Sequence, residues 1–270
     1  MNKRDKLSVG RDTVLAVPVP RKGVLGAQAA RTKFDLSTRA PSAELADFVE
    51  YYWLVSWRRT TPHEQQVVPH PNVHLVFEPE GTLLYGVMRG RFVRRLIGEG
   101  HVLGVRFHPG GFRPWLGRPV STLTDKVVPD FLDVAPETVL SAGDDAAMVA
   151  AAEAVLLARR PEVDPVVRDV RAMVAAIEHG VSRVDDLARE SGLAVRSVQR
   201  LFNEYVGVGP KWVIRRLRMH EAAARAEVGG DVDWASLAVE LGYSDQAHFT
   251  RDFRANIGIT PARYAATLRP

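Results

Sequence analysis

The sequence predicts an α+β protein. A β-rich N-terminal domain, built as a small antiparallel sandwich or partial barrel, is followed by an all-α domain with two helix-turn-helix units. Three observations lead to this fold class: short apolar runs alternate with turn residues in the first half, a helical segment is repeated in the last third, and a proline-bounded junction separates the two regions. The expected parts are a basic flexible arm at 1–39, the β-rich domain at 40–160, a linker at 161–165 and the helical domain at 166–270.

Composition limits the classes of protein to consider. The chain has 270 residues, 46% of them hydrophobic, which is enough for two domains with buried cores. No run approaches the roughly eighteen apolar residues of a membrane span, and no signal peptide opens the sequence, so we expect a cytoplasmic protein that does not contact a membrane. The absence of cysteine excludes disulfides, thiolate zinc sites and cysteine nucleophiles.

The first half of the chain changes from a charged arm to a strand pattern. Residues 1–39 carry nine lysines and arginines against three aspartates, with weak periodicity, which predicts a mobile tail. Ser42 is a suitable N-cap for a helix that reaches Tyr52. Beyond it we expect strands near 53–57, 73–77, 83–87, 92–97 and 102–107, with turns at Glu80-Gly81 and at Gly98-Glu99-Gly100. Short strands at near-regular spacing favour an antiparallel sandwich or partial barrel.

This β-rich region contains a candidate effector pocket. Aromatic walls with one converging charge suit the capture of a small molecule. The residues that could line such a pocket are Tyr51, Trp53, Trp57, Arg106 and Trp115. Phe112 and Trp115 follow the sharp turn at Gly110-Gly111, and core packing is the more usual role for such aromatic side chains.

A metal site is an alternative hypothesis for the same region. His70, His74 and Glu78 share strand parity, and two histidines with a carboxylate suit a non-haem metal. His74 is more simply interpreted as a core or pocket histidine bonded to the backbone. We therefore assign no metal and no cofactor.

Two helices surround the junction. The alanine-rich stretch from Asp144 to Arg160 predicts a helix that packs on the β-rich domain or pairs with a second copy of the chain. Pro161 and Pro165 then interrupt helical structure on both sides. The helical domain is expected to begin with a helix at 166–178.

The last third of the chain repeats one unit. The first copy runs from Leu187 through Gly192 to Phe202 and closes with Gly207-Val208-Gly209-Pro210; the second begins at Leu237 and closes with Gly258-Ile259-Thr260-Pro261. The glycines Gly192 and Gly242 are 50 apart, whereas later equivalent positions, such as Arg200 and Arg251, are 51 apart. The second copy therefore has one extra residue just after its glycine. We expect helix-turn-helix units at about 184–205 and 234–256, joined by a helix at 211–228.

Helical spacing gives each second helix an inner and an outer face. Val195, Val198, Leu201, Phe202 and Tyr205 should pack inward in the first copy, and Phe249, Phe253 and Ile257 in the second. The outer faces carry Arg196, Gln199, Arg200 and Asn203, and then Gln246, Ala247, Thr250, Arg251 and Arg254. Arginine pairs with guanine, and glutamine or asparagine pairs with adenine, in the DNA major groove. Solvated polar faces are the alternative, but they give no reason for an arginine to recur at equivalent positions.

These motifs resemble the AraC family of transcription regulators. The resemblance rests on Leu187-Ala188 to Pro210, on Leu237-Ala238-x-x-x-Gly242-Tyr243 with Phe249-Thr250-Arg251-x-Phe253-Arg254, and on Gly258-Ile259-Thr260-Pro261-x-x-Tyr264. It implies that both recognition helices enter successive major-groove segments, with Arg196, Gln199, Arg200, Gln246, Thr250 and Arg251 reading bases. Asn203, Arg215, Arg216 and Arg254 are the candidates for backbone contacts. By analogy, the N-terminal domain would be a cupin-like barrel that senses a small molecule or dimerises.

The two copies depart from one another in two ways. Ala194 stands where a serine usually caps the first recognition helix, which should cost about 1 kcal/mol, whereas Ser244-Asp245 keeps caps in the second. Ala247 occupies the position equivalent to Arg196 and is too short for a base hydrogen bond. We expect the two units to contribute unequally to sequence recognition.

The resulting prediction is a sequence-specific DNA-binding transcription regulator, not an enzyme. Its expected partner is double-stranded DNA, with RNA polymerase, a small-molecule effector and a second copy of the chain as further candidates. The helical domain carries 15 basic against 13 acidic residues, so the prediction depends on where the arginines lie and not on a strong net charge. The alternatives are a metal-dependent cupin-type enzyme with an appended DNA-binding or interaction domain, and a helical domain that binds another protein.

Overall fold

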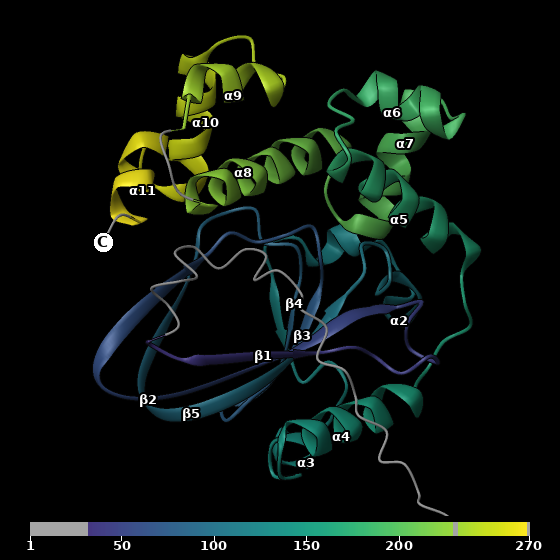
Figure 1. The fold of residues 1–270 in the computed structure, drawn as a ribbon. Helices are drawn as coiled ribbons and strands as arrows, with labels where there is room; N and C mark the ends of the chain where they lie inside the picture. The colour runs from purple at the N-terminus through teal and green to yellow at the C-terminus, as the bar shows by residue number, and fades with distance from the viewer. Residues whose placement is uncertain (1–31, 229–231, 269–270) are drawn as a thin grey trace, which may run out of the picture.

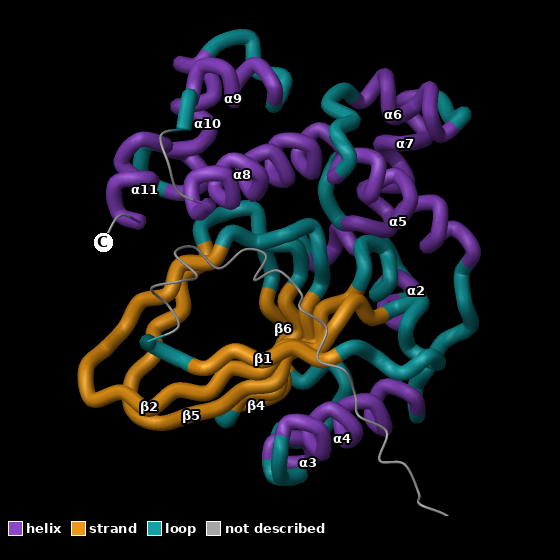
Figure 2. The backbone as a smooth tube through the Cα atoms, in the orientation of Figure 1, coloured by secondary structure: helices purple, strands orange, loops and turns teal. Residues whose placement is uncertain are grey.

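A computed structural model describes residues 32–228 and 232–268. Its N-terminal half contains one six-stranded antiparallel sheet of order β1-β2-β5-β3-β4-β6. The strands are β1 (Asp35–Arg39), β2 (Val49–Val67), β3 (His74–Glu78), β4 (Gly81–Tyr85), β5 (Phe92–Phe107) and β6 (Val127–Pro129). β2 and β5 are far longer than the others and form a ribbon that bends away from the short strands (Figures 1 and 2). In the part of the chain described, all strands belong to this sheet, in agreement with the partial barrel rather than the sandwich.

Alternation along the strands separates the sheet into two faces. On β2, Tyr52 and Leu54 lie in the main hydrophobic core, whereas Tyr51 and Trp53, which point to the other face, line a cavity. The core face is covered by short and long helices whose apolar side chains complete it. These are α2 (Arg113–Leu116), the 3-10 helix η1 (Val120–Leu123), α3 (Glu137–Leu140) and α4 (Asp145–Leu157). Helix α4 confirms the alanine-rich helix expected from the sequence.

The C-terminal half is helical and contains both predicted helix-turn-helix units. The first consists of α6 (Val184–Ser191) and α7 (Val195–Leu201), extended by the π-helix η2 (Phe202–Val206); the second consists of α9 (Trp234–Glu240) and α10 (Gln246–Ile257). They are preceded by α5 (Pro165–Glu178), joined by α8 (Pro210–Val228) and followed by α11 (Pro261–Leu268). Figure 1 shows α8 as a bridge with one unit at each end and the sheet beneath it.

The repeated Gly-x-x-Pro is explained by the helix ends. Gly207 and Gly258 end the two recognition segments with φ of 93° and 96°, a left-handed conformation that favours glycine. Pro210 and Pro261 are the first residues of the helices that follow, where a missing N–H costs nothing. The repeat is therefore a stop signal and a start signal for helices.

Three local expectations were wrong. Residues 43–48 form turns instead of a helix, and Val49 already lies in β2. Gly98-Glu99-Gly100 is no turn, because β5 continues through it opposite the equally long β2. Residues 35–39, expected in the arm, form β1, which pairs with β2. Residues 1–31 of the arm and the Gly229-Gly230 end of the connecting helix lie outside the described residues. No helix in the described part of the chain is long and apolar enough to cross a membrane.

Candidate DNA-binding surface and the cavity beneath it

The turns of the two helix-turn-helix units differ by one residue. Gly192 and Gly242 both adopt positive φ, 67° and 74°. In the first unit the recognition helix α7 is preceded by Ala194, two residues after the glycine, and in the second α10 is preceded by Asp245, three residues after it. The extra residue predicted from the 50- and 51-residue spacings thus lies in the second turn.

The two recognition helices begin differently. The Asp245 carboxylate accepts hydrogen bonds from the backbone N–H of His248 at 2.7 Å and from the Ser244 hydroxyl at 3.1 Å. These two bonds hold the pKa of Asp245 below its usual range. Ala194 offers no side-chain acceptor at the start of α7. The expected difference in capping is confirmed, because the equivalent N–H in α7, that of Ser197, donates to the backbone carbonyl of Ala194 and not to a side chain.

The predicted inner faces are buried. Val198, Phe202, Phe249, Phe253 and Ile257 are each at most 2% exposed. Val195, Leu201 and Tyr205 are partly buried against the same core as Val198. This burial fixes the rotation of α7 and α10 about their axes. Only the opposite face of each helix is therefore left for a ligand.

The predicted reading residues lie on that opposite face. The exposed ones are Arg196, Gln199, Arg200, Asn203, Gln246, Arg251 and Arg254, while Thr250 is half-buried. Within the described residues none of the four arginines in this set forms an ion pair, unlike Arg189 with Asp186 and Arg225 with Glu221. Their guanidinium groups can therefore meet a new partner without first breaking a salt bridge.

Helix α8 holds the two units in one arrangement. The Nη2 of Arg218 donates to the carbonyl of Ser182 at 2.7 Å, just before α6, and its guanidinium lies 5.3 Å from the ring centre of Tyr243 in the second turn. Arg215 forms a two-pronged ion pair with Asp252 of α10, with Nε 3.0 Å from Oδ2. One side chain of α8 therefore contacts both units, and another fixes the second recognition helix.

Arg216 was expected on the surface as a phosphate contact, and this was wrong. It is 2% exposed, its Nη2 donates to the carbonyl of Arg89 at 2.5 Å, and its guanidinium lies 4.7 Å from the ring centre of Trp212. Burial lowers the pKa of Arg216 to about 10. The sequence pattern could not show this, because the surface that covers Arg216 belongs to the sheet half. Arg215 is half-exposed but paired with Asp252, so a phosphate would have to compete with that carboxylate.

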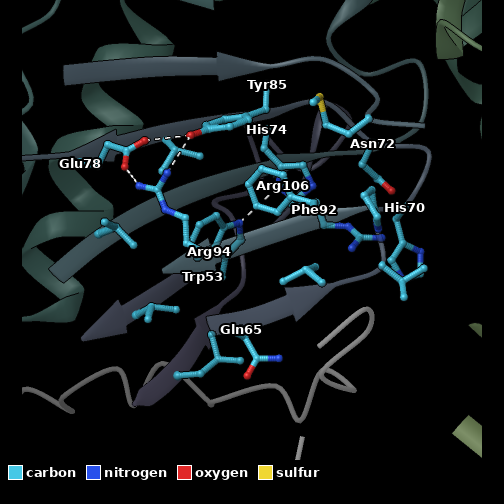
Figure 3. A pocket seen from close by; sticks show the side chains of 18 of the residues that line it. Trp53, Gln65, His70, Asn72, His74, Glu78, Tyr85, Phe92, Arg94 and Arg106 are labelled. Carbon is cyan, nitrogen blue, oxygen red and sulfur yellow. Dashed lines mark hydrogen bonds and ion pairs between the residues drawn. The ribbon is translucent and has the colours of Figure 1, made fainter. Parts of the chain in front are cut away.

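A cavity of about 230 Å³ lies on the other face of the sheet (Figure 3). Four of the five residues predicted for an effector pocket line it, namely Tyr51, Trp53, Trp57 and Arg106. Trp115 does not, because it packs on the core face against Phe48, with ring centres 4.7 Å apart, and against Phe107. The two roles that the sequence left open for Trp115 are thus resolved in favour of the core.

Two clusters of polar groups line the cavity. Arg106 Nε donates to Glu50 Oε2 at 2.8 Å and Nη1 to the Tyr51 hydroxyl at 3.3 Å. Farther along the ribbon, Arg94 is paired with the buried Glu78, which also accepts from the Tyr85 hydroxyl at 3.0 Å (Figure 3). Arg94 and Tyr85 were not predicted for this pocket. For Arg94 the signal was the alternation of Phe92, Arg94 and Leu96 along one face of a strand, in which a charge occupies an inward position.

His74 is a neutral pocket histidine. The indole Nε1–H of Trp53 donates to Nδ1 of His74 at 3.2 Å. His74 is therefore bonded to a side chain, whereas a bond to the backbone was expected. Burial, with a contribution from nearby Arg106, lowers the pKa of His74 to about 3. Since Nδ1 accepts, the proton of the neutral imidazole is on Nε2.

The hypothetical metal ligands are engaged elsewhere. His74 is bonded to Trp53, Glu78 to Arg94 and Tyr85, and the His70 ring is stacked on His220 of α8 with ring centres 3.5 Å apart. The residues that the structure describes contain no group of three or more side chains suited to hold a metal ion.

One wall of the cavity also contacts the helical half. Val67, Val68, Pro69 and His70 line the cavity, and Val68 is buried in the core of the second helix-turn-helix unit. In addition to the stacked rings, Nε2 of His220 lies 3.3 Å from the carbonyl of Pro69. Gln66, just before this segment, donates to the carbonyl of Ile257 at the end of α10 at 3.0 Å. The segment at 66–70, which we call the shared wall, therefore contacts the cavity and the second unit.

Comparisons with known proteins match separate families to the sheet half and the helical half of the chain. Residues 187–267 match a helix-turn-helix domain family, and residues 37–129 match a family described as a domain of unknown function, DUF6597. The HTH-type transcriptional regulator ExsA of Pseudomonas aeruginosa is 30% identical over 82 residues, which are 30% of this chain and 29% of ExsA. The probable transcription factor PqrA of Proteus vulgaris is 32% identical over 82 residues, covering 30% of this chain and 66% of PqrA. Each of these two relatives thus matches 30% of this chain, and the chain spans 29% of the length of ExsA and 66% of that of PqrA.

Solved structures give weaker matches. An AraC-type transcriptional regulator from Chromobacterium violaceum is 24% identical, with a TM-score of 0.35, over 37% of this chain and 92% of its own. ToxT from Vibrio cholerae is 10% identical, with a TM-score of 0.43, over 88% of this chain and 100% of its own.

Proposed function

We propose, from the premise that residues 187–267 form an AraC-type helix-turn-helix domain, that the protein is a sequence-specific DNA-binding transcription regulator. In this proposal α7 and α10 enter successive major-groove segments on one face of the duplex, about one turn or roughly 34 Å apart. Bases are read by Arg196, Gln199, Arg200, Gln246, Thr250 and Arg251, and the DNA backbone is held by Asn203 and Arg254.

One observation carries the proposal. Arg200 and Arg251 occupy equivalent positions on α7 and α10, each of which buries its opposite face. Both arginines are exposed, and neither has an ion-pair partner in the described part of the chain. A protein-binding or merely solvated surface gives no reason for this repetition. The inner faces repeat because both units need a core, but the outer arginines repeat only if both meet the same kind of ligand.

The proposal assigns sensing to the sheet half. A molecule in the cavity touches the shared wall, and the shared wall contacts α8 and the end of α10 through His70–His220, Val68 and Gln66. Cavity occupancy would therefore change the position of the second recognition helix first. A ligand can shift DNA affinity only by the difference in its affinity for the two arrangements.

Selection from a random DNA library with the purified full chain tests the reading function. We expect enrichment of a two-part motif whose parts are about one helical turn apart. Arg200→Ala should relax preference in one part and Arg251→Ala in the other, each by about 1–3 kcal/mol, or roughly 5- to 150-fold. Arg225→Ala removes the same charge from the exposed side of α8 and is the matched control.

The same selection can refute the assignment. If all three substitutions weaken binding equally on enriched and scrambled DNA, the arginines contact only phosphates. A salt titration on the enriched site distinguishes phosphate contacts from base contacts. Loss of a phosphate contact lowers the salt dependence of binding by about one counterion for each contact.

A further inference from the structure

The floor of the cavity is made by two pairs of tryptophan and glycine. In the β2–β5 register Trp53 lies opposite Gly104, and Trp57 lies opposite Gly100. A Cβ at Gly104 would be 2.0 Å from Cε2 of Trp53, and one at Gly100 would be 2.5 Å from Cζ2 of Trp57. Both indoles thus cover the backbone of β5 at positions that a larger residue would fill. Both are only partly buried, and both line the cavity.

Among the described residues, this arrangement leaves the two indoles with few aromatic partners. Trp53 has one ring neighbour there, His74, at 6.3 Å and edge-on, and Trp57, which packs against the cluster of Phe34 and Leu96, has no stacked or edge-on ring contact. The other large aromatic side chains of this half, such as Phe107 and Trp115, pack against rings in the core. Aromatic surfaces gain from stacked or edge-on partners beyond the area they bury. The indole floor is therefore suited to a flat ring system.

The described residues that line the cavity offer no net charge to a ligand. The arginines that line it, Arg94 and Arg106, are each paired with a carboxylate, Glu78 and Glu50. An ionised ligand would lose its hydration and gain no unpaired counter-charge. An uncharged molecule avoids this cost, and the Nε2–H of neutral His74 can donate to one acceptor on it.

We propose that the cavity binds an uncharged, flat aromatic molecule that packs on the indoles of Trp53 and Trp57 and accepts a hydrogen bond from His74. This inference rests on the proposed function only in calling the molecule an effector. The binding itself is independent of DNA. It would also stand if the helical half bound something other than DNA.

Two fluorescent probes with the same ring systems test the charge preference on the full chain. N-phenyl-1-naphthylamine is neutral, whereas 8-anilinonaphthalene-1-sulfonate carries an added sulfonate. We expect the neutral probe to saturate one site and to bind at least tenfold more tightly than the sulfonate. Equal affinity for the two probes, or no saturable binding of the neutral one, would overturn the proposal.

Competition and substitution test the aromatic preference. 2-Naphthol should displace the neutral probe at a concentration at least tenfold lower than 1-adamantanol, an alcohol of similar size without an aromatic ring. Gly104→Ala should weaken probe binding at least tenfold by moving the Trp53 indole, whereas Gly90→Ala, which meets nothing within 4 Å, should leave it unchanged. Displacement by both alcohols at the same concentration would show a merely apolar cavity. The competition needs no variant, so it decides the question even if Gly104→Ala does not fold.

Discussion

Replacing Arg215 by methionine should loosen the second recognition helix and spare the first. Its guanidinium holds Asp252 by two contacts, and Asp252 also accepts from the Tyr243 hydroxyl at 3.3 Å. Asp252 is 8% exposed, so its carboxylate would lose the guanidinium that pairs with it while remaining largely out of water. Methionine keeps most of the apolar stem of the arginine, so the substitution mainly tests the charge.

The size of the effect follows from the exposure of the two partners. Breaking a fully buried pair costs about 3–5 kcal/mol, whereas an exposed pair contributes about 0–1 kcal/mol. The Arg215 side chain is 48% exposed and that of Asp252 is 11% exposed. We therefore expect Arg215→Met to lower the free energy of unfolding by about 1–3 kcal/mol, between these limits.

Denaturant unfolding and DNA selection check this expectation together. Arg225→Met, which removes an exposed pair with Glu221 on the same helix, should cost about 0.5 kcal/mol or less. In the selected motif, Arg215→Met should reduce discrimination in the part read by α10 and preserve that read by α7. Asp252→Asn should cost less in the Arg215→Met background than in the natural chain, because the pair is already broken.

Equal stability of Arg215→Met and Arg225→Met, or an equal loss of discrimination in both parts of the motif, would refute this role of Arg215. The first result would mean that water or a rearranged neighbour satisfies Asp252. The second would mean that Arg215 acts on the whole interface, as a simple phosphate contact does.

Three further predictions concern capping, pH and the cavity floor. Ala194→Ser should stabilise α7 by about 0.5–2 kcal/mol by supplying the missing cap, a gain that thermal unfolding would show and that loss of stability would contradict. Burial lowers the pKa of His74 to about 3 and that of His108 to about 4, so only the unfolded chain takes up these protons as pH falls below about 6.5. Stability should therefore decline from pH 6.5 towards pH 4, and His74→Gln should flatten the slope; an unchanged slope would exclude His74 as a cause. Gly104→Ala should cost about 1–3 kcal/mol through overpacking, whereas the exposed Gly90→Ala should be neutral or slightly stabilising, and equal stability of the two variants would show that the indole moves freely.

Much of the helical half could be predicted because its signals are local. The spacing of Val198 and Phe202 fixes the buried face of α7, and the turn glycines and the prolines at helix starts fix where helices end and begin. These effects act within a few residues of one another, so they are visible in a linear sequence. The one-residue difference between the two turns was likewise readable from two spacings.

The sheet half was predicted less well because its organisation depends on pairing between distant strands. β5 runs without a break through Gly98-Glu99-Gly100, since β2 offers hydrogen-bond partners along its whole length. Gly98 and Gly100 resemble turn residues in the sequence, but Gly100 makes room for the Trp57 indole. A glycine that allows a turn and a glycine that allows a close approach look alike until the opposite strand is known.

In the helical half, the sequence by itself determined the two helix-turn-helix units, which faces of their recognition helices are buried, and that the two equivalent outer faces carry arginines. Only the tertiary structure decided which of the other arginines are accessible. Arg216 is covered by the loop at Arg89, and Arg215 is held by Asp252, although the two residues are adjacent on one helix. It also decided that Trp115 belongs to the core while Trp53 faces a cavity. Periodicity records the face of an element that is buried, but not the element that buries it, because that partner is set by packing between segments far apart in the chain.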